Sequence, residues 1–246
     1  MGTRFASPGE QSAQIGHHYG NPTNHFWSCL HESGLTSRRL DPREDHLLPK
    51  EFSMGLTNLQ NDLSKAEQTS GVPLLLEKVA RYRPLILCFV GLGIADIVRS
   101  GVGSGSKNDL KGKAAFGLQP YKMVHPYDEA DSHQQFRDSS DPHDARNASE
   151  TLFFAVSSTS GRVVRYQKAD KIEQFKQLRA VLRDMKTGGL DTSKLTTVST
   201  PPTSTPTPSA SKDRLGMDET PNENPFDLRV GFTYEIEEHV YFTVLL

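Results

Sequence analysis

Apolar residues form two short continuous runs in this chain, and each run adjoins a segment with helical spacing. The first run covers residues 85–90 and follows a helical pattern over 72–82 that stops before Pro84. The second run covers residues 151–156 and precedes a helical pattern over 169–186. A continuous apolar run of this length is typical of a strand buried on both faces of a parallel sheet. The pattern therefore predicts an α/β fold, with a mostly parallel sheet between helices.

Two weaker patterns extend this layout. A glycine at position 91 predicts a turn after the first strand, and residues 94–98 fit a helix that follows it. Asn21 and Pro22 predict a helix start, because asparagine caps a first turn and proline tolerates the first helical position. We expect this helix to run to Gly34, since glycine readily adopts the left-handed conformation that ends a helix.

Polar segments separate and follow these units. Residues 126–150 are rich in Asp, Ser, His and Gln, which is typical of a disordered insertion. Residues 188–225 are rich in Ser, Thr and Pro and predict a disordered linker. Residues 226–246 form a C-terminal tail whose alternation fits a strand or hairpin. We expect one domain over residues 1–187, interrupted by the acidic insertion.

The net charge of −2 hides an uneven distribution. Residues 1–125 hold 14 Lys and Arg against 11 Asp and Glu, and residues 151–187 hold 8 against 3. The acidic excess lies in residues 126–150 and 188–246. A basic body suits phosphate binding, since distant acidic groups are screened beyond a Debye length of about 8–10 Å. No apolar stretch reaches the roughly 20 residues that span a bilayer, so we expect no membrane association.

Cysteine and histidine patterns favour no metal or cofactor. Cys29 and Cys88 lie within apolar patterns, where a small buried side chain is the simpler interpretation. Two cysteines exclude both a disulfide framework and a four-cysteine iron–sulfur cluster. Four histidines lie near the N-terminus: His17, His18, His25 and His31. Their spacing does not make a helical ligand pair, and we expect no zinc site.

Several short motifs follow one another along the chain. They are GHHY at 16–19, NHFW at 24–27, ESGLT at 32–36, GLTN at 55–58, FGLQP at 116–120 and STSGR at 158–162. Their order resembles the mismatch-specific uracil/thymine DNA glycosylase family in a eukaryotic, fungal form. The resemblance covers roughly residues 7–186, apart from the acidic insertion. It implies a uracil-DNA-glycosylase-like three-layer fold, a nuclear monomer without a cofactor, and hydrolysis of the N-glycosidic bond in base-excision repair.

The resemblance also implies a base-binding site. An enzyme that cuts a base from its sugar must flip the nucleotide out of the stack and hold the base by a polar edge and an aromatic face. The resemblance places Tyr19 against the flipped pyrimidine, and His18, Asn24 and Asn58 near its edge. Residues 54–59 predict the end of a strand that delivers Asn58 to the rim of the site.

A second part of the site is implied for the DNA backbone. Ser158, Thr159 and Ser160 are expected to bind the phosphates around the flipped sugar. Arg162 resembles the side chain that enters the duplex where the base has left. The expected substrate is double-stranded DNA with a G·U or G·T mismatch. The residues alone also allow a plainer interpretation, in which Tyr19 is a core aromatic and Arg162 an ordinary surface arginine.

The pattern departs from the family at its activating group. The family carries an asparagine in a Gly-Ile-Asn-Pro-Gly turn after the first strand, and this chain has Ser7 at that position. A serine hydroxyl is shorter than an amide and places its lone pairs differently, so we expect a loss on the order of 10²-fold in rate. The first strand itself is reduced to residues 1–5, which would leave unpaired edges on its neighbours.

Two interpretations of this departure stay open. In one, the sequence begins too late because of an incorrect start or splice choice, and it is an incomplete gene product. In the other, the chain is an inactive paralogue that binds DNA or a partner without cleavage. The remaining motifs favour a DNA glycosylase by lineage, with Ser7 and His18 as the candidate catalytic residues.

Overall fold

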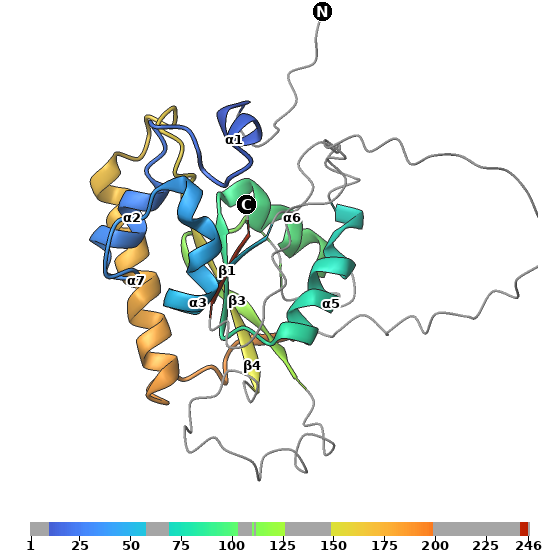
Figure 1. Ribbon diagram of the computed structural model, residues 1–246. Helices are drawn as coiled ribbons and strands as arrows, with labels where there is room; N and C mark the ends of the chain where they lie inside the picture. The colour runs from blue at the N-terminus through green and yellow to red at the C-terminus, as the bar shows by residue number, and fades with distance from the viewer. Residues whose placement is uncertain are drawn as a thin grey trace, which may run out of the picture.

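A mixed sheet forms the centre of the computed structural model (Figure 1). The residues that the structure describes are 10–57, 69–102, 110, 112–125, 149–198 and 242–245. Within them the strand order is β1-β6-β2-β4-β3-β5. The strands are β1 (Met54–Thr57), β2 (Ile86–Val90), β3 (Gly117–Val124), β4 (Glu150–Val156), β5 (Thr196–Val198) and β6 (Phe242–Leu245). Neighbouring strands are parallel except β3 and β4, which are antiparallel.

Helices cover both faces of this sheet. They are α1 (Glu10–Ile15), α2 (Phe26–Glu32), the 3-10 helix η1 (Pro42–Leu47), α3 (Leu48–Phe52), α5 (Val72–Tyr82), α6 (Leu92–Val102) and α7 (Lys168–Lys186). Figure 1 shows α2, α3 and α7 on one side of the sheet and α5 and α6 on the other. The predicted three-layer α/β fold with a mostly parallel sheet is therefore confirmed.

Alternation along the central strands explains the three layers. In β2, Ile86 and Cys88 pack into the cluster beneath α2 and α7, whereas Leu87 and Phe89 pack into the cluster beneath α5 and α6. All four side chains are fully buried. A strand buried on both faces must be apolar at every position, which is the pattern that the sequence carries over residues 85–90.

The first predicted helix begins later than its sequence pattern suggests. Helix α2 starts at Phe26, not at Pro22. The side-chain oxygen of Asn21 accepts from the backbone N–H of Thr23 at 2.9 Å, and that of Asn24 accepts from Phe26 at 3.0 Å. These local bonds turn the backbone before the helix can begin. Residues 21–25 therefore form a loop.

Strand β3 has no counterpart in the sequence pattern. It alternates between buried and more exposed positions, with Gln119, Tyr121 and Met123 inside. Its pairing with β4 shifts between Leu118 and Lys122. The residue between Gln119 and Tyr121 is Pro120, which cannot donate to a sheet ladder. A proline in this position hides a strand from sequence-based prediction.

Strand β6 lies between β1 and β2 and is parallel to both (Figure 1, dark red). Thr243 is aligned with Gly55 on one side and with Leu87 on the other. Four residues from the C-terminal tail therefore occupy an interior position of the described sheet. Residues 1–9 lie outside the described part of the chain, as do residues 126–148 of the acidic insertion and 199–225 of the linker.

The described helices include none that is both long and apolar enough to cross a bilayer.

A buried histidine at the end of β3 couples stability to pH. His125 is only 5% exposed. Its Nε2 donates to the Thr151 hydroxyl at 2.8 Å, and that hydroxyl in turn donates to the carbonyl of Pro84 at 2.5 Å. Burial, with a smaller effect of Arg83, lowers the pKa of His125 to about 4. The folded protein therefore holds this imidazole neutral.

We expect the free energy of unfolding to fall as the pH drops below about 6.5, because the unfolded chain binds a proton at His125 that the folded chain rejects until about pH 4. The contribution of this residue at pH 5 is a loss of about 2 kcal/mol relative to neutral pH. Urea unfolding at pH 7.5 and pH 5 measures it. His125→Gln keeps a donor for Thr151 but has no titratable side chain. The decrease in its free energy of unfolding between pH 7.5 and pH 5 should therefore be about 2 kcal/mol smaller than that of the unmodified chain. Equal losses in the two proteins would contradict the assignment.

Candidate active site

The loops that leave the carboxyl ends of the central strands meet at one end of the sheet. Strand β2 ends at Val90 and passes through Gly91 into α6, while β4 ends at Val156 and enters a serine-rich loop. The backbone N–H of Gly91 donates to the carbonyl of Val156 at 2.9 Å, which holds the two strand ends together. In open parallel sheets this is the end at which ligands bind.

Two of the predicted base-binding residues line one cavity. The cavity has a volume of about 550 Å³, and the residues that line it include Tyr19, Asn24, Trp27, Arg39 and Arg43. The hydroxyl of Tyr19 and the indole N–H of Trp27 are buried without a hydrogen-bond partner among the described residues. Buried donors without a partner are rare in folded proteins and mark places where a polar ligand or water can bind.

Tyr19 combines a strained backbone with a stacked ring. Its φ of 52° lies in the left-handed region, which side chains other than glycine seldom adopt. Its ring stacks on Phe26 with centroids 3.8 Å apart and planes 18° apart. Burial, with a smaller effect of Cys88, raises the pKa of the Tyr19 hydroxyl well above its ordinary value. Phe26 covers one face of the ring, so a ligand can stack only on the opposite face.

The hydrogen bonds of Asn24 decide which of its side-chain atoms is available. Its Oδ1 accepts from the backbone of Phe26, as described above. Its own backbone N–H donates to Asn21 at 2.8 Å. This network assigns the amide nitrogen to the other side, where it can donate to a carbonyl oxygen of a ligand in the cavity.

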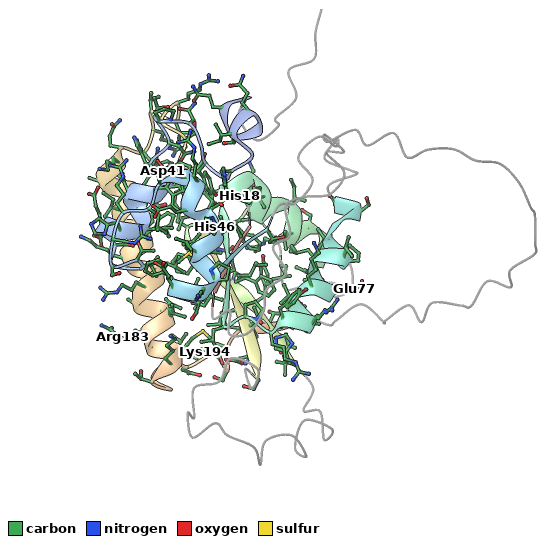
Figure 2. The ribbon with its side chains drawn as sticks, viewed as in Figure 1. His18, Asp41, His46, Glu77, Arg183 and Lys194 are labelled. Carbon is green, nitrogen blue, oxygen red and sulfur yellow. The ribbon has the colours of Figure 1, made fainter. Side chains whose placement is uncertain are left out.

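His18 is buried against a carboxylate that the sequence analysis did not single out. Asp45 accepts from the Nδ1 of His18 at 2.9 Å, from its backbone N–H at 3.0 Å and from the Nδ1 of His17 at 2.9 Å. His18 is 6% exposed and Asp45 is 1% exposed. In the view of Figure 2, His18 lies at the end of the sheet from which α6 begins.

The serine-rich loop and the 21–25 loop pack into one unit. The carbonyl of Thr159 accepts from the backbone N–H of His25 at 2.9 Å. A Cβ added at Gly161 would collide with the backbone carbonyl of Thr23. Ser158 and Ser160 are partly exposed and Arg162 is exposed, whereas the Thr159 side chain is buried. The loop can therefore offer two hydroxyls and one guanidinium to a nucleic acid.

A buried lysine on α7 fastens the same two loops. The Nζ of Lys171 donates to the carbonyl of Ser160 at 2.8 Å and lies 3.4 Å from the Nδ1 of His25. Burial lowers the pKa of Lys171. Burial, together with Lys171 and Lys168, also lowers the pKa of His25, so that its Nδ1 can accept from the ammonium. Lys171 lies one helical turn before the buried Phe175, and a lysine on an apolar stripe was the available sequence signal.

We expect Gly161→Ala to weaken DNA binding about tenfold, because the new methyl group must push the serine-rich loop away from Thr23 at a cost of about 1–3 kcal/mol. Fluorescence anisotropy with a labelled DNA duplex measures the dissociation constant. Gly93→Ala is the matched control, since a Cβ at Gly93 meets no atom within 4 Å. The packing of the two loops would have no role in binding if both variants bound as tightly as the unmodified chain.

Two predicted site residues lie outside the described part of the chain. Asn58 directly follows Thr57, the last residue of β1, and Ser7 lies before α1. Their roles stay predictions. Across the described residues, no group of three or more His, Cys, Asp or Glu side chains is placed to hold a metal ion.

One comparison with known families matches most of the chain. The model of the uracil DNA glycosylase superfamily covers residues 6–186. The matched range includes the 16–19 and 24–27 motifs, the cavity wall and the serine-rich loop. Strand β6 lies outside the range that the family model matches.

Proposed function

Because this chain belongs to the uracil-DNA glycosylase superfamily, we propose that it is a mismatch-specific DNA glycosylase. Its substrate would be double-stranded DNA, in which it hydrolyses the N-glycosidic bond of uracil or thymine paired with guanine. Membership of the superfamily accounts for the general activity on DNA. The preference for a mismatch is the proposed part, and it rests on the motif resemblance and on the site.

The cavity beside Tyr19 is the observation that supports base binding most directly. Its lining includes the aromatic side chains of Tyr19 and Trp27 together with Asn24. A flipped pyrimidine carries both a flat face and carbonyl oxygens, so it can stack on the ring of Tyr19 and accept from the amide nitrogen of Asn24.

The serine-rich loop supplies the contact with the duplex. Ser158 and Ser160 suit phosphate oxygens, because serine hydroxyl and backbone N–H groups are among the donors that contact a DNA backbone. The exposed Arg162 is on the same loop and can enter the space that the flipped base leaves. Lys171 and the 21–25 loop both bond to the backbone of the serine-rich loop, so they hold the loop that carries Arg162 beside the cavity.

The proposed reaction breaks the bond between C1′ of the sugar and N1 of the pyrimidine. Water supplies the oxygen that bonds to C1′, and its proton neutralises the departing base. Negative charge develops on the base as the bond breaks, and donors fixed near the base oxygens stabilise that charge. We assign stabilisation of this charge to the amide of Asn24. We assign the transfer of the proton to His18 and the orientation of the water to the side chain of Ser7.

Single-turnover kinetics with an excess of the purified full chain test the proposal. We expect release of uracil from a G·U duplex, faster than from a matched A·U duplex, together with slower release of thymine from G·T. Equal rates from G·U and A·U would contradict the mismatch preference. Absence of release from every duplex would contradict the glycosylase activity of this chain.

Ser7 specifically favours a second candidate, a protein that binds mismatched DNA without cleaving it. That candidate predicts tighter binding to a G·U duplex than to a G·C duplex and no base release after long incubation. Uracil release at any measurable enzyme-dependent rate would exclude it.

A further inference from the structure

Asp45 is a carboxylate with an unusual load of hydrogen bonds from one short segment. It accepts from two imidazoles and from one backbone N–H, all within residues 17–18. Its side chain is completely buried. We infer that Asp45 is a positioning residue for His18 in the glycosylase reaction, an inference that rests on the proposed function.

The hydrogen bonds determine which nitrogen of His18 carries the proton. A carboxylate only accepts, so the Nδ1 of His18 must be protonated to bond with it at 2.9 Å. In the neutral ring the lone pair is then on Nε2. Nε2 is accordingly the nitrogen that can take up or release a proton without breaking the bonds to Asp45. A buried carboxylate that fixes the imidazole in one tautomer is the usual way in which a catalytic histidine is oriented.

The segment that carries Asp45 is itself well anchored. Helix η1 has a capping box in which the Asp41 side chain and the Glu44 side chain each accept a backbone N–H of the opposite residue. Arg38 donates to Glu44 at 2.8 Å. The carbonyl of Asp45 accepts the backbone N–H of Leu48 at the start of α3. Because η1 is held in place by these bonds, Asp45 can hold the ring of His18, which lies 27 residues earlier in the chain, in one orientation.

A purely structural role for Asp45 can be separated from positioning by an isosteric change. In Asp45→Asn the amide oxygen can keep both bonds from His18, because both of its partners there are donors. The amide nitrogen then faces His17, which can accept after moving its own proton to Nε2. We therefore expect Asp45→Asn to keep the fold and the place of His18 while it removes the negative charge beside His18.

The first measurement is single-turnover uracil release from a G·U duplex across pH 5–9. We expect Asp45→Asn to lower the maximal rate about 10²-fold and to change the pH profile, with little change in the enzyme concentration at half-saturation. His17 is the other titratable group on this carboxylate, so His17→Asn is measured over the same range to separate its titration. Glu51→Gln is the matched control, since it removes an exposed carboxylate of the adjoining helix α3 whose pair with Arg38 spans 3.4 Å, and it should keep the rate within about twofold because surface pairs contribute little.

The second measurement is nitrogen-15 NMR of the histidine side chains in the unmodified chain and in Asp45→Asn. We expect His18 of the unmodified chain to carry its proton on Nδ1 at neutral pH. A proton on Nε2 in the unmodified chain, or an unchanged rate and pH profile in Asp45→Asn, would overturn the inference. If Asp45→Asn does not fold, the NMR result on the unmodified chain decides. If the unmodified chain releases no base, the proposed function fails, and the NMR result alone then decides whether Asp45 fixes His18.

Discussion

Thr243→Pro is expected to unfold the domain, or to lower its free energy of unfolding by about 1–3 kcal/mol, because a ladder acceptor loses its N–H donor. Thr243 is paired on both sides, with Gly55 and with Leu87. Proline lacks the N–H that a ladder needs and is found in sheets on edge strands or at irregularities, such as the register shift around Pro120 of β3. Because β6 is internal to the sheet, the substitution would break the connection between β1 and β2. Urea and thermal unfolding, followed by circular dichroism, measure the loss.

Thr243→Val is the matched control for this prediction. Valine keeps the backbone N–H and has a high preference for strands, so the variant should unfold within about 1 kcal/mol of the unmodified chain. Hydrogen exchange gives an independent test, since amides of β1 and β2 should lose protection in the proline variant. A proline variant with unchanged unfolding midpoint and unchanged protection would show that β6 does not stabilise the sheet.

Ser7→Asn is expected to raise the single-turnover rate of uracil release on the order of 10²-fold, the scale that a positioned catalytic group contributes. The motif resemblance places the water-orienting asparagine of the family at this position, where the chain has a shorter hydroxyl. An amide offers both a donor and an acceptor at greater reach. Release of uracil from a G·U duplex, measured with enzyme in excess, gives the comparison.

Ser7→Ala completes this experiment. If the serine retains part of the role of the asparagine, alanine should lower the rate further, whereas DNA affinity should be similar in all three proteins. An asparagine variant that folds and binds the duplex but shows no gain in rate would contradict the assignment of position 7. It would favour a protein that binds mismatched DNA without turnover.

Local patterns predicted those elements whose sequence and surroundings agree. Helix α5 (Val72–Tyr82) was predicted at its observed bounds, because its apolar spacing faces one layer and Pro84 prevents continuation. The predicted start of α2 at Pro22 was wrong, because Asn21 forms a local turn with Thr23 and does not cap the helix. Strand β3 was missed because Pro120 and the buried Gln119 interrupt its apolar alternation.

Long-range relations explain what the sequence could not show. The position of β6 depends on which strands it pairs with, and no local pattern encodes a partner far away in the chain. Asp45 is similar, since an aspartate among charged neighbours gives no signal until folding brings it to His17 and His18. Tyr19 and Asn24, in contrast, were predicted through the motif resemblance, and the structure brings both to one cavity.

The place of β6 also affects how the domain is assembled. Strand β2 is the next strand after β1 along the chain. Within the described sheet, however, the two strands do not pair with each other, and β6 from the far end of the chain lies between them. Closing so long a loop costs entropy before any pairing repays it, and such distant contacts slow folding. We expect β2, β4 and β3 to form a nucleus first and β1 to join last, once residues 242–245 have docked, so refolding should be slow.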